Sequence, residues 1–331
     1  MSAAARLRQA WQQRGPLALL LWPLTLPYRL LTALRRALYR TGLLKQHRLP
    51  VPVIVVGNVI VGGAGKTPVT LALLQHLRAA GWRPGVISRG YGRQTISCRP
   101  ALPTSSAAEV GDEPLLIARS AGVPVYVARR RADAGRALLA AHPEVNILVC
   151  DDGLQHLQLA RDVEVCVFND EGIGNGWLLP AGPLREPWPR AVDLVLHAGA
   201  APGGSAPQFP LSRRLADHAV DAKGRQLPLA QLRGLKLHAL AAIARPQDFF
   251  AMLRAQGLPP ATEEALPDHY DFYSWKRPSD KRLIPICTEK DAVKLWPAHP
   301  GALAVPLRLD IPAAFFAALD ARLASLSSPR H

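Results

Sequence analysis

Short apolar runs alternate with helical patterns along most of the chain. Residues 53–56 form a β-branched run that leads into a glycine-rich loop, and residues 68–80 then carry helical spacing up to Gly81, a typical terminator. Further strands are expected at 86–88, 123–127, 146–150, 163–168 and 194–196, and further helices at 113–120 and 132–141. Near-continuous apolar strands separated by helices are typical of a buried parallel sheet. The pattern therefore predicts an α/β fold in which helices sandwich a parallel sheet.

A linker is expected in the middle of the chain. Residues 199–208, GAAPGGSAPQ, carry no charge and are rich in Gly, Ala and Pro. The segments 215–220 and 226–229 flank a short turn and predict a β-hairpin, and a second α/β unit follows with strands at 237–243 and 283–287 and a helix at 247–255. We expect four parts: an arm over 1–48, the main α/β domain over 49–198, a linker and hairpin over 199–232, and a smaller α/β domain over 233–331.

The N-terminal arm carries most of the excess positive charge. The chain has 331 residues with 40 Lys and Arg against 25 Asp and Glu, and nine of these cations but no acid fall within the first 50 residues. Residues 16–28 are uncharged, a run shorter than the roughly 20 residues of a bilayer span. Pro23 and Pro27 are expected to interrupt a continuous helix. Flanking aromatic and basic side chains favour a segment lying in the membrane interface, the alternative being a core helix with a solvated basic face.

Composition excludes several other classes of protein. With 49% hydrophobic and 20% charged residues, the chain can bury a large core and is not disordered throughout. The cations of the arm are interleaved with Leu rather than with Gly, Ser or Asn, which argues against a nucleic-acid-binding arm. The four cysteines are widely separated and form no C-x-x-C pair, so neither structural zinc nor a disulfide framework is expected, and a reducing cytoplasm fits best.

A phosphate-binding loop is predicted at 57–68, GNVIVGGAGKTP, directly after a strand and before a helix. Small residues let backbone N–H groups surround an anion, and the helix N-terminus adds partial positive charge. Lys66 is placed to reach the β- and γ-phosphates, and Thr67 to place its hydroxyl on Mg²⁺. Ile60 replaces a motif glycine, so this is a variant loop, and a plain glycine-rich turn is the alternative. The predicted phosphate-binding residues are Ile60, Val61, Gly62, Gly63, Ala64, Gly65, Lys66 and Thr67.

A second nucleotide-binding element is predicted at 146–153, NILVCDDG. An apolar strand that ends in carboxylates can hold Mg²⁺ directly or through water, as Walker B sequences do. Two adjacent carboxylates repel each other, and a divalent cation relieves that repulsion. A plain Asp-Asp-Gly turn is the alternative.

The motifs together resemble the tetraacyldisaccharide 4′-kinases of lipid A biosynthesis. The resemblance rests on GNVIVGGAGKTP (57–68), SRGYGR (88–93), GDEP (111–114), DDGLQH (151–156), LLPAGPLREP (178–187), PDHY (267–270) and TEKDAVK (288–294). It implies a peripheral kinase at the cytoplasmic face of the bacterial inner membrane. Such an enzyme transfers the γ-phosphoryl of ATP, with Mg²⁺, to the 4′-hydroxyl of tetraacyldisaccharide 1-phosphate, giving lipid IVA, and no obligate protein partner or nucleic acid is expected. The family fold has two α/β/α domains joined by a short two-stranded link.

The resemblance also implies roles for single residues. Asp112 is the expected base for the sugar hydroxyl with His269 as its partner, and Lys66 is expected to be catalytic. The metal and phosphate side of the site comprises Thr67, Asp151, Asp152 and Gln155. His156 belongs to the same motif and is expected to contact substrate or metal-bound water. From residue type and position, substrate contacts are also predicted for Arg89, Tyr91, Arg131, Arg185 and Glu186, and nucleotide contacts in the second domain for Thr288, Lys290 and Asp291.

A purely structural role is the alternative for several of these residues. Asp112 before Glu113 and Pro114 suits a helix N-cap, and Thr288 suits the cap of a following helix. Residues 88–92 also suit a structural turn. Arg131 is either a phosphate-binding residue or a solvated cation. The Arg185–Glu186 pair either contacts substrate or forms an ion pair that stabilises its own loop.

Parts of the sequence are also compatible with two other functions. A P-loop GTPase or partitioning-type ATPase shares the GKT sequence, but Val61 replaces the signature Lys of that ATPase, and Glu289 replaces the Lys of the guanine-reading motif. A GTP competition assay separates this class. A nucleotide-independent basic protein is the second alternative, and it predicts that Lys66→Ala retains function and that binding weakens steeply with salt.

Overall fold

The structure is a computed structural model, and it describes residues 7, 9–63, 65–268 and 270–327. The chain forms two compact units. Unit 1 comprises residues 1–89, 130–212 and 311–331, and unit 2 comprises residues 90–129 and 213–310. The units are thus not the continuous segments expected from sequence. The C-terminal helix returns to pack beside a strand of unit 1, and residues 90–129 belong to the same compact unit as residues 213–310.

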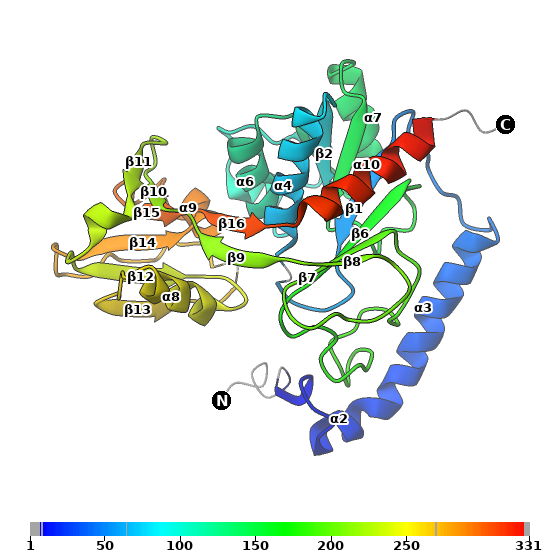
Figure 1. Ribbon diagram of the computed structural model, residues 1–331, viewed down its shortest axis with the longest axis horizontal. Helices are drawn as coiled ribbons and strands as arrows, with labels where there is room; N and C mark the ends of the chain where they lie inside the picture. Colours follow the sequence, from blue (N-terminus) through cyan, green and yellow to red (C-terminus); the bar gives the residue numbers. More distant parts are fainter. Residues whose placement is uncertain (1–6, 8, 64, 269, 328–331) are drawn as a thin grey trace. The chain divides into compact units, whose positions relative to one another are not determined.

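Unit 1 is built on a mainly parallel sheet (Figure 1). Its strands run in the order β2-β5-β1-β6-β7-β8, with bounds β1 (Val53–Gly57), β2 (Pro84–Ser88), β5 (Ile147–Asp151), β6 (Val163–Phe168), β7 (Leu194–His197) and β8 (Gln208–Pro210). The central strand β1 pairs in parallel with both β5 and β6. Every residue of β1, β2 and β5 is buried, which explains their continuous apolar sequences. β8 uses the end of the expected linker and extends this sheet beside β7.

Three helices pack on the sheet of unit 1: α4 (Lys66–Ala79), α7 (Arg131–Ala141) and α10 (Ala313–Ser327). The helices α4 and α7 and the strands β1, β2, β5, β6 and β7 lie within a few residues of their predicted positions. The α/β fold with a phosphate loop between the first strand and its helix is therefore confirmed. The helix α10 was not predicted.

The N-terminal arm is helical and mostly uncovered. It consists of α2 (Pro16–Leu21), the 3₁₀ turn η1 (Trp22–Leu24) and α3 (Thr25–Arg40). Pro23 lies in the 3₁₀ turn and Pro27 in the first turn of α3, where its missing N–H is not needed, so the helical segment continues. The helical segment is thus longer than the uncharged run at 16–28, and the 25 residues from Pro16 to Arg40 are long and apolar enough to cross a membrane by length and composition. Few of them are buried, which excludes the core-helix alternative.

Unit 2 contains a mixed sheet in the order β11-β10-β15-β14-β12-β13. The bounds are β10 (His218–Val220), β11 (Gln226–Pro228), β12 (Leu237–Ala241), β13 (Thr262–Ala265), β14 (Ile284–Thr288) and β15 (Leu303–Val305). The predicted hairpin is present as β10 and β11, and β10 also pairs with β15. A separate pair, β9 (Ser212–Leu215) and β16 (Leu307–Asp310), lies where the chain enters and then leaves unit 2.

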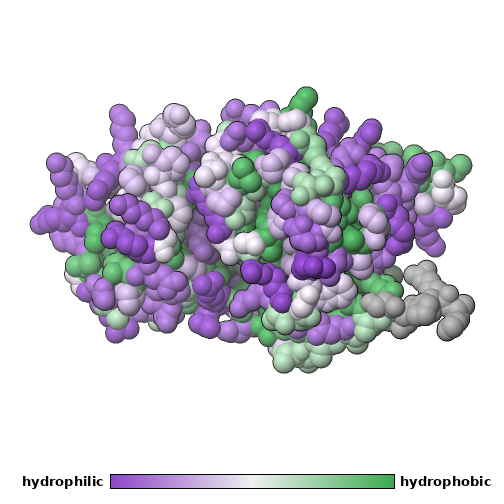
Figure 2. Space-filling model, turned by 90° about the horizontal axis from the view of Figure 1, so that it is seen from above, coloured by the Kyte–Doolittle hydropathy of each residue, from purple (hydrophilic) through white to green (hydrophobic). Residues whose placement is uncertain are grey.

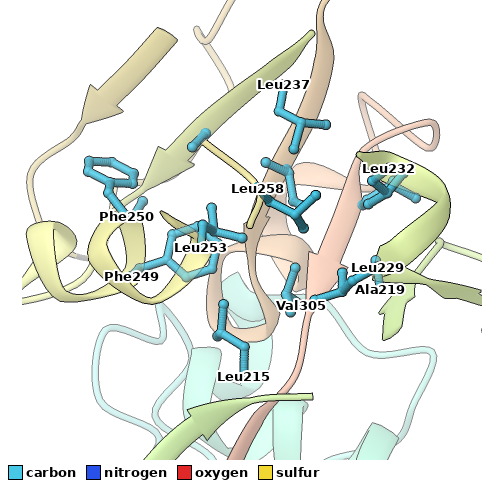
Figure 3. Close-up of a cluster of buried hydrophobic side chains, with 14 residues drawn as sticks. Leu215, Ala219, Leu229, Leu232, Leu237, Phe249, Phe250, Leu253, Leu258 and Val305 are labelled. Carbon is cyan, nitrogen blue, oxygen red and sulfur yellow. The ribbon is translucent and has the colours of Figure 1, made fainter. Parts of the chain in front are cut away.

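The core of unit 2 lies between its sheet and α8 (Pro246–Ala255). Phe249, Phe250 and Leu253 of that helix gather with Leu237 and Leu258 in one cluster (Figure 3). The remaining elements are β3 (Arg99–Pro100), β4 (Val125–Val127), α5 (Ala107–Val110), α6 (Asp112–Ala121), η2 (Leu229–Leu232) and α9 (Glu289–Leu295). Helix α6 packs on α9, which brings the motifs GDEP and TEKDAVK together within unit 2.

Candidate active site

The phosphate loop connects the buried strand β1 to the first turn of α4. Gly62 and Gly65 have positive φ values of 108° and 76°, which only glycine adopts at little cost. The loop is anchored from outside, since Val61 N–H donates to the carbonyl of Pro183 over 2.8 Å. Lys66 and Thr67 begin α4 and are only 9% and 8% exposed. The loop thus places a lysine and a threonine at a helix N-terminus, as phosphate binding requires. Ala64 lies outside the described residues.

The two carboxylates at the end of β5 have different surroundings. Asp151 is buried and accepts a hydrogen bond from Thr70 Oγ1 of α4 over 2.9 Å. Asp152 adopts a left-handed conformation with φ 48°, unusual for a residue with a side chain. Its Oδ1 lies 3.6 Å from Lys66 Nζ and 3.8 Å from Arg185 Nη1. Asp152 therefore faces the phosphate loop, whereas Asp151 is bound to the helix behind it.

Gln155 and the Arg185–Glu186 pair form a network next to Asp152. The amide of Gln155 donates to Asn58 O over 2.8 Å and to Glu186 Oε1 over 2.7 Å, while Arg185 Nη1 donates to Gln155 Oε1 over 3.4 Å. Glu186 is buried, and its carboxylate also pairs with Arg36 of α3. Glu186 thus ties its loop to the arm, whereas Arg185 lies near the carboxylate that faces Lys66.

Two side chains of the arm that are not among the predicted site residues reach this network. Besides Arg36, Tyr28 of α3 donates its hydroxyl to the carbonyl of Arg185 over 2.7 Å. A helical spacing of eight places Tyr28 and Arg36 on nearly the same face of α3, and this was the available signal. This spacing alone does not show that their partners are Arg185 and Glu186, because those residues lie far away in the sequence.

Arg131 and His156 lie beside the turn after β5. Arg131 is buried and donates from Nη2 to the carbonyl of Asp152 over 3.1 Å, so the solvated-cation alternative is excluded. His156 Nε2 accepts the backbone N–H of Arg131 at 3.4 Å. Burial and the nearby arginines, Arg131 and Arg161 foremost, lower the pKa of His156 to about 3, so the imidazole is neutral at physiological pH. Because Nε2 is the acceptor, the proton of the neutral ring lies on Nδ1, which can donate one hydrogen bond.

In unit 2, Asp112 pairs with Lys294, which is not among the predicted site residues. Gly111, not Asp112, is the N-cap of α6, and no side-chain capping bond is formed, so the capping alternative is not realised. Instead Lys294 Nζ of α9 lies 2.9 Å from Asp112 Oδ2. A Cβ at Gly111, where φ is 92°, would lie 2.8 Å from the carbonyl of Tyr91. Glycine is therefore required for the motifs SRGYGR and GDEP to meet.

Residues 288–291 form the start of α9. Thr288 is the N-cap: its Oγ1 accepts the N–H of Asp291 at 3.2 Å and donates to Asp291 Oδ2 at 2.7 Å. Asp291 is buried and also accepts the N–H of Ala242, and burial raises its pKa. Lys290 pairs with Asp268 over 3.4 Å. The plainer capping role of Thr288 is thus present, and contacts from these residues to the nucleotide stay a prediction.

The remaining predicted residues differ in exposure. Arg89 and Tyr91 are exposed, with Arg89 at the end of unit 1 and Tyr91 in unit 2. His269 lies outside the described residues, so the predicted pairing with Asp112 stays a prediction.

Comparison with known proteins identifies the family. The family model described as tetraacyldisaccharide-1-P 4′-kinase matches residues 17–324. The chain is 80% identical to the tetraacyldisaccharide 4′-kinase of Acidovorax ebreus (strain TPSY), over 99% of this chain and 97% of that protein. It is 64% identical to that of Verminephrobacter eiseniae (strain EF01-2), over 95% of this chain and 74% of that protein.

A solved structure is also similar. It is the crystal structure of LpxK from Aquifex aeolicus in complex with ATP, at 27% identity and a TM-score of 0.82, covering 94% of this chain and all of that one. The phosphate loop, the DDGLQH turn and the order of the motifs agree with these likenesses: the chain belongs to the tetraacyldisaccharide 4′-kinase family.

Proposed function

We propose that this protein transfers the γ-phosphoryl group of ATP to the 4′-hydroxyl of tetraacyldisaccharide 1-phosphate in lipid A biosynthesis. The observation that carries the proposal is the placement of Lys66 at the N-terminus of α4, 3.6 Å from Asp152 at the end of β5. The named activity of close relatives and the ATP bound to a similar structure support it.

The phosphate side of the reaction belongs to unit 1. The loop amides and the α4 N-terminus surround the β- and γ-phosphates, and Lys66 neutralises negative charge on the γ-phosphoryl as the bridging bond breaks. Arg185, beside Asp152, is placed to contact a phosphate. Because phosphoryl transfer depends mostly on positioning and charge neutralisation, these groups provide most of the rate enhancement.

The residues around Asp152 fit a magnesium ion. Asp152 Oδ1 is shielded from solvent and accepts no hydrogen bond from the described residues, although two cations lie within 4 Å. Mg²⁺ prefers such carboxylate oxygens together with hydroxyls and phosphate oxygens. Among the described residues no group of three His, Cys, Asp or Glu forms a metal site, which suits an ion shared with the nucleotide. Asp152 and Thr67 would hold it, and it would neutralise charge on the phosphates. Asp151 is hydrogen-bonded to Thr70, and Gln155 to Asn58 and Glu186, so these two residues support the metal-binding residues from outside.

The acceptor side belongs to Asp112 in unit 2. Its carboxylate accepts the proton of the 4′-hydroxyl as that oxygen bonds to the γ-phosphorus and ADP leaves. A positioned base of this kind contributes roughly 10²–10⁴-fold.

The helical arm holds the enzyme at the membrane that contains its lipid substrate. Large apolar side chains of the arm are exposed to solvent, among them Leu20 at 75%, Leu30 at 69% and Leu31 at 66%. Hydrophilic side chains predominate on the face of the molecule shown in Figure 2, whereas exposed apolar side chains recur along the arm. Arginines of α3 suit anionic lipid headgroups. Attachment at the cytoplasmic face places the phosphate site where ATP is available.

The test is transfer of label from γ-labelled ATP to tetraacyldisaccharide 1-phosphate in detergent micelles. The wild type is compared with Lys66→Ala, Asp112→Asn and the exposed-lysine control Lys281→Met. We expect labelled lipid with the wild type and control, and a loss of at least about 10²-fold in kcat with the other two. ATP hydrolysis without labelled lipid would show that the acceptor is wrong. Full activity of folded Asp112→Asn would remove the base role but keep the kinase.

A further inference from the structure

A buried ion pair connects two motifs of unit 2. Lys294 Nζ lies 2.9 Å from Asp112 Oδ2, and the two side chains are only 6% and 11% exposed. Charges removed from water are costly unless they are closely paired, so this contact fixes the relative position of both groups. Lys294 lies one helical turn after Lys290 on α9, and Asp112 is the first residue of α6, which packs on α9.

The surroundings hold the ammonium group in place. Lys294 Nζ lies 5.7 Å from the ring centroid of Phe272, close enough for a cation–π interaction. Phe272 is buried and has a φ of 61°, a conformation that a bulky residue adopts only where neighbouring structure imposes it. It follows the PDHY motif, so three motifs of unit 2 converge on this ion pair.

Two other charged groups near the pair, Lys290 and Asp291, have partners of their own. Lys290 pairs with Asp268 over 3.4 Å. Asp291 accepts hydrogen bonds from Ala242 and Thr288, and it interacts with Lys290 and Lys294 through space. Glu113 follows Asp112 along α6. Lys294 is therefore the cation that directly contacts the Asp112 carboxylate among these groups.

We propose that Lys294 is a positioning residue for the phosphoryl transfer, which keeps Asp112 ionised and fixes its carboxylate for the acceptor hydroxyl. The proposal rests on the role of Asp112 as base given above. A cation at this distance favours the charged form of a carboxylate, and the N-terminus of α6 acts in the same direction. The 4′-oxygen then bonds to the γ-phosphorus, the bond to the ADP oxygen breaks, and the hydroxyl proton passes to Asp112, whose carboxyl group becomes neutral.

The experiment measures kcat/KM against pH for the full-length wild type, Lys294→Gln, Lys294→Arg and the control Lys281→Gln. With Lys294→Gln, which keeps a donor but loses the charge, we expect kcat/KM at pH 7 to fall by about 10²-fold. We also expect the acidic limb of the variant's pH profile of kcat/KM to move to higher pH by about one unit or more, while KM for ATP changes little. Lys294→Arg keeps the acidic limb of the wild type. A merely structural pair would not move this limb, so an unmoved limb with kcat/KM within about threefold of the wild type would overturn the proposal.

A measurement on the wild type covers the case in which Lys294→Gln does not fold. The carboxyl carbon-13 signal of Asp112, assigned with Asp112→Asn, is followed from pH 9 to pH 5. We expect no titration in this range, and a titration within it would overturn the proposal. Failure of the base role itself is separate, since it requires that folded Asp112→Asn transfer phosphoryl at the wild-type rate.

Discussion

Gln155 donates a hydrogen bond to Glu186 over 2.7 Å, and the same carboxylate pairs with Arg36 of the N-terminal arm. Arg190 lies 3.3 Å from it on the same loop. One buried carboxylate thus connects the arm, the LLPAGPLREP loop and the DDGLQH turn within unit 1. Glu186 therefore stabilises the contact between the arm and its loop, whereas the side chain of its neighbour Arg185 lies near Asp152.

Glu186→Ala is expected to destabilise the protein. Removal of the Glu186 carboxylate leaves Arg36, Arg190 and Gln155 without their shared partner. Such a change typically lowers the free energy of unfolding by about 3–5 kcal/mol. Urea denaturation measures the free energy of unfolding, with the exposed-site variant Glu144→Ala as control, expected within about 0.5 kcal/mol of the wild type. A stable Glu186→Ala variant with a raised KM for the lipid would instead make Glu186 a substrate contact.

The arm's exposed leucines are expected to determine membrane binding. Replacing Leu20, Leu30 and Leu31 by serine removes apolar side chains that each contribute about 1.5–3 kcal/mol when buried in an apolar medium. Vesicle co-sedimentation should show a loss of affinity of about 10²-fold or more. Leu235→Ser provides the control, because Leu235 is 47% exposed but lies in unit 2. Equal losses from both variants would contradict a specific role for the arm.

Much of unit 1 and its site could be predicted from sequence because the signals there are local. The run at 53–56, the loop glycines and Lys66 adjoin one another, and strand, loop and helix follow in order. The Asp112–Lys294 pair could not be predicted in this way, since capping rules use only neighbours in sequence, and these rules favoured Asp112 as a cap. The two units interleave along the chain for the same reason: α6 packs on α9 through contacts that no local pattern records.

Asp291 is expected to act on stability more than on nucleotide binding. Its buried carboxylate accepts bonds from Ala242 N–H and Thr288 Oγ1, and bonds to a charged group contribute about 1.5–3 kcal/mol each. Asp291→Ala should therefore lower the free energy of unfolding by a few kcal/mol, and Thr288→Ala, which removes the cap, by about 1 kcal/mol. Isothermal titration with ATP should give nearly unchanged affinity for folded protein. A clear loss of ATP affinity with unchanged stability would support the predicted nucleotide contact instead.

Glu289, at the start of α9, is expected to make stability depend on pH. Burial raises its pKa above the usual value, and Arg308 only partly opposes this effect. Below about pH 4.5 both folded and unfolded chains hold the proton, so the contribution of this group is fully favourable there. As pH rises from that value through the raised pKa, the unfolded chain releases its proton first, and stability is lost. Glu289→Gln removes this loss, so its free energy of unfolding relative to that of the wild type should increase as pH rises from about 4.5 through the raised pKa and then level off. Urea denaturation across this range measures the difference, with Glu144→Gln as the exposed control. A constant difference across the range would contradict the expectation, because it would mean that the two states of Glu289 bind the proton equally.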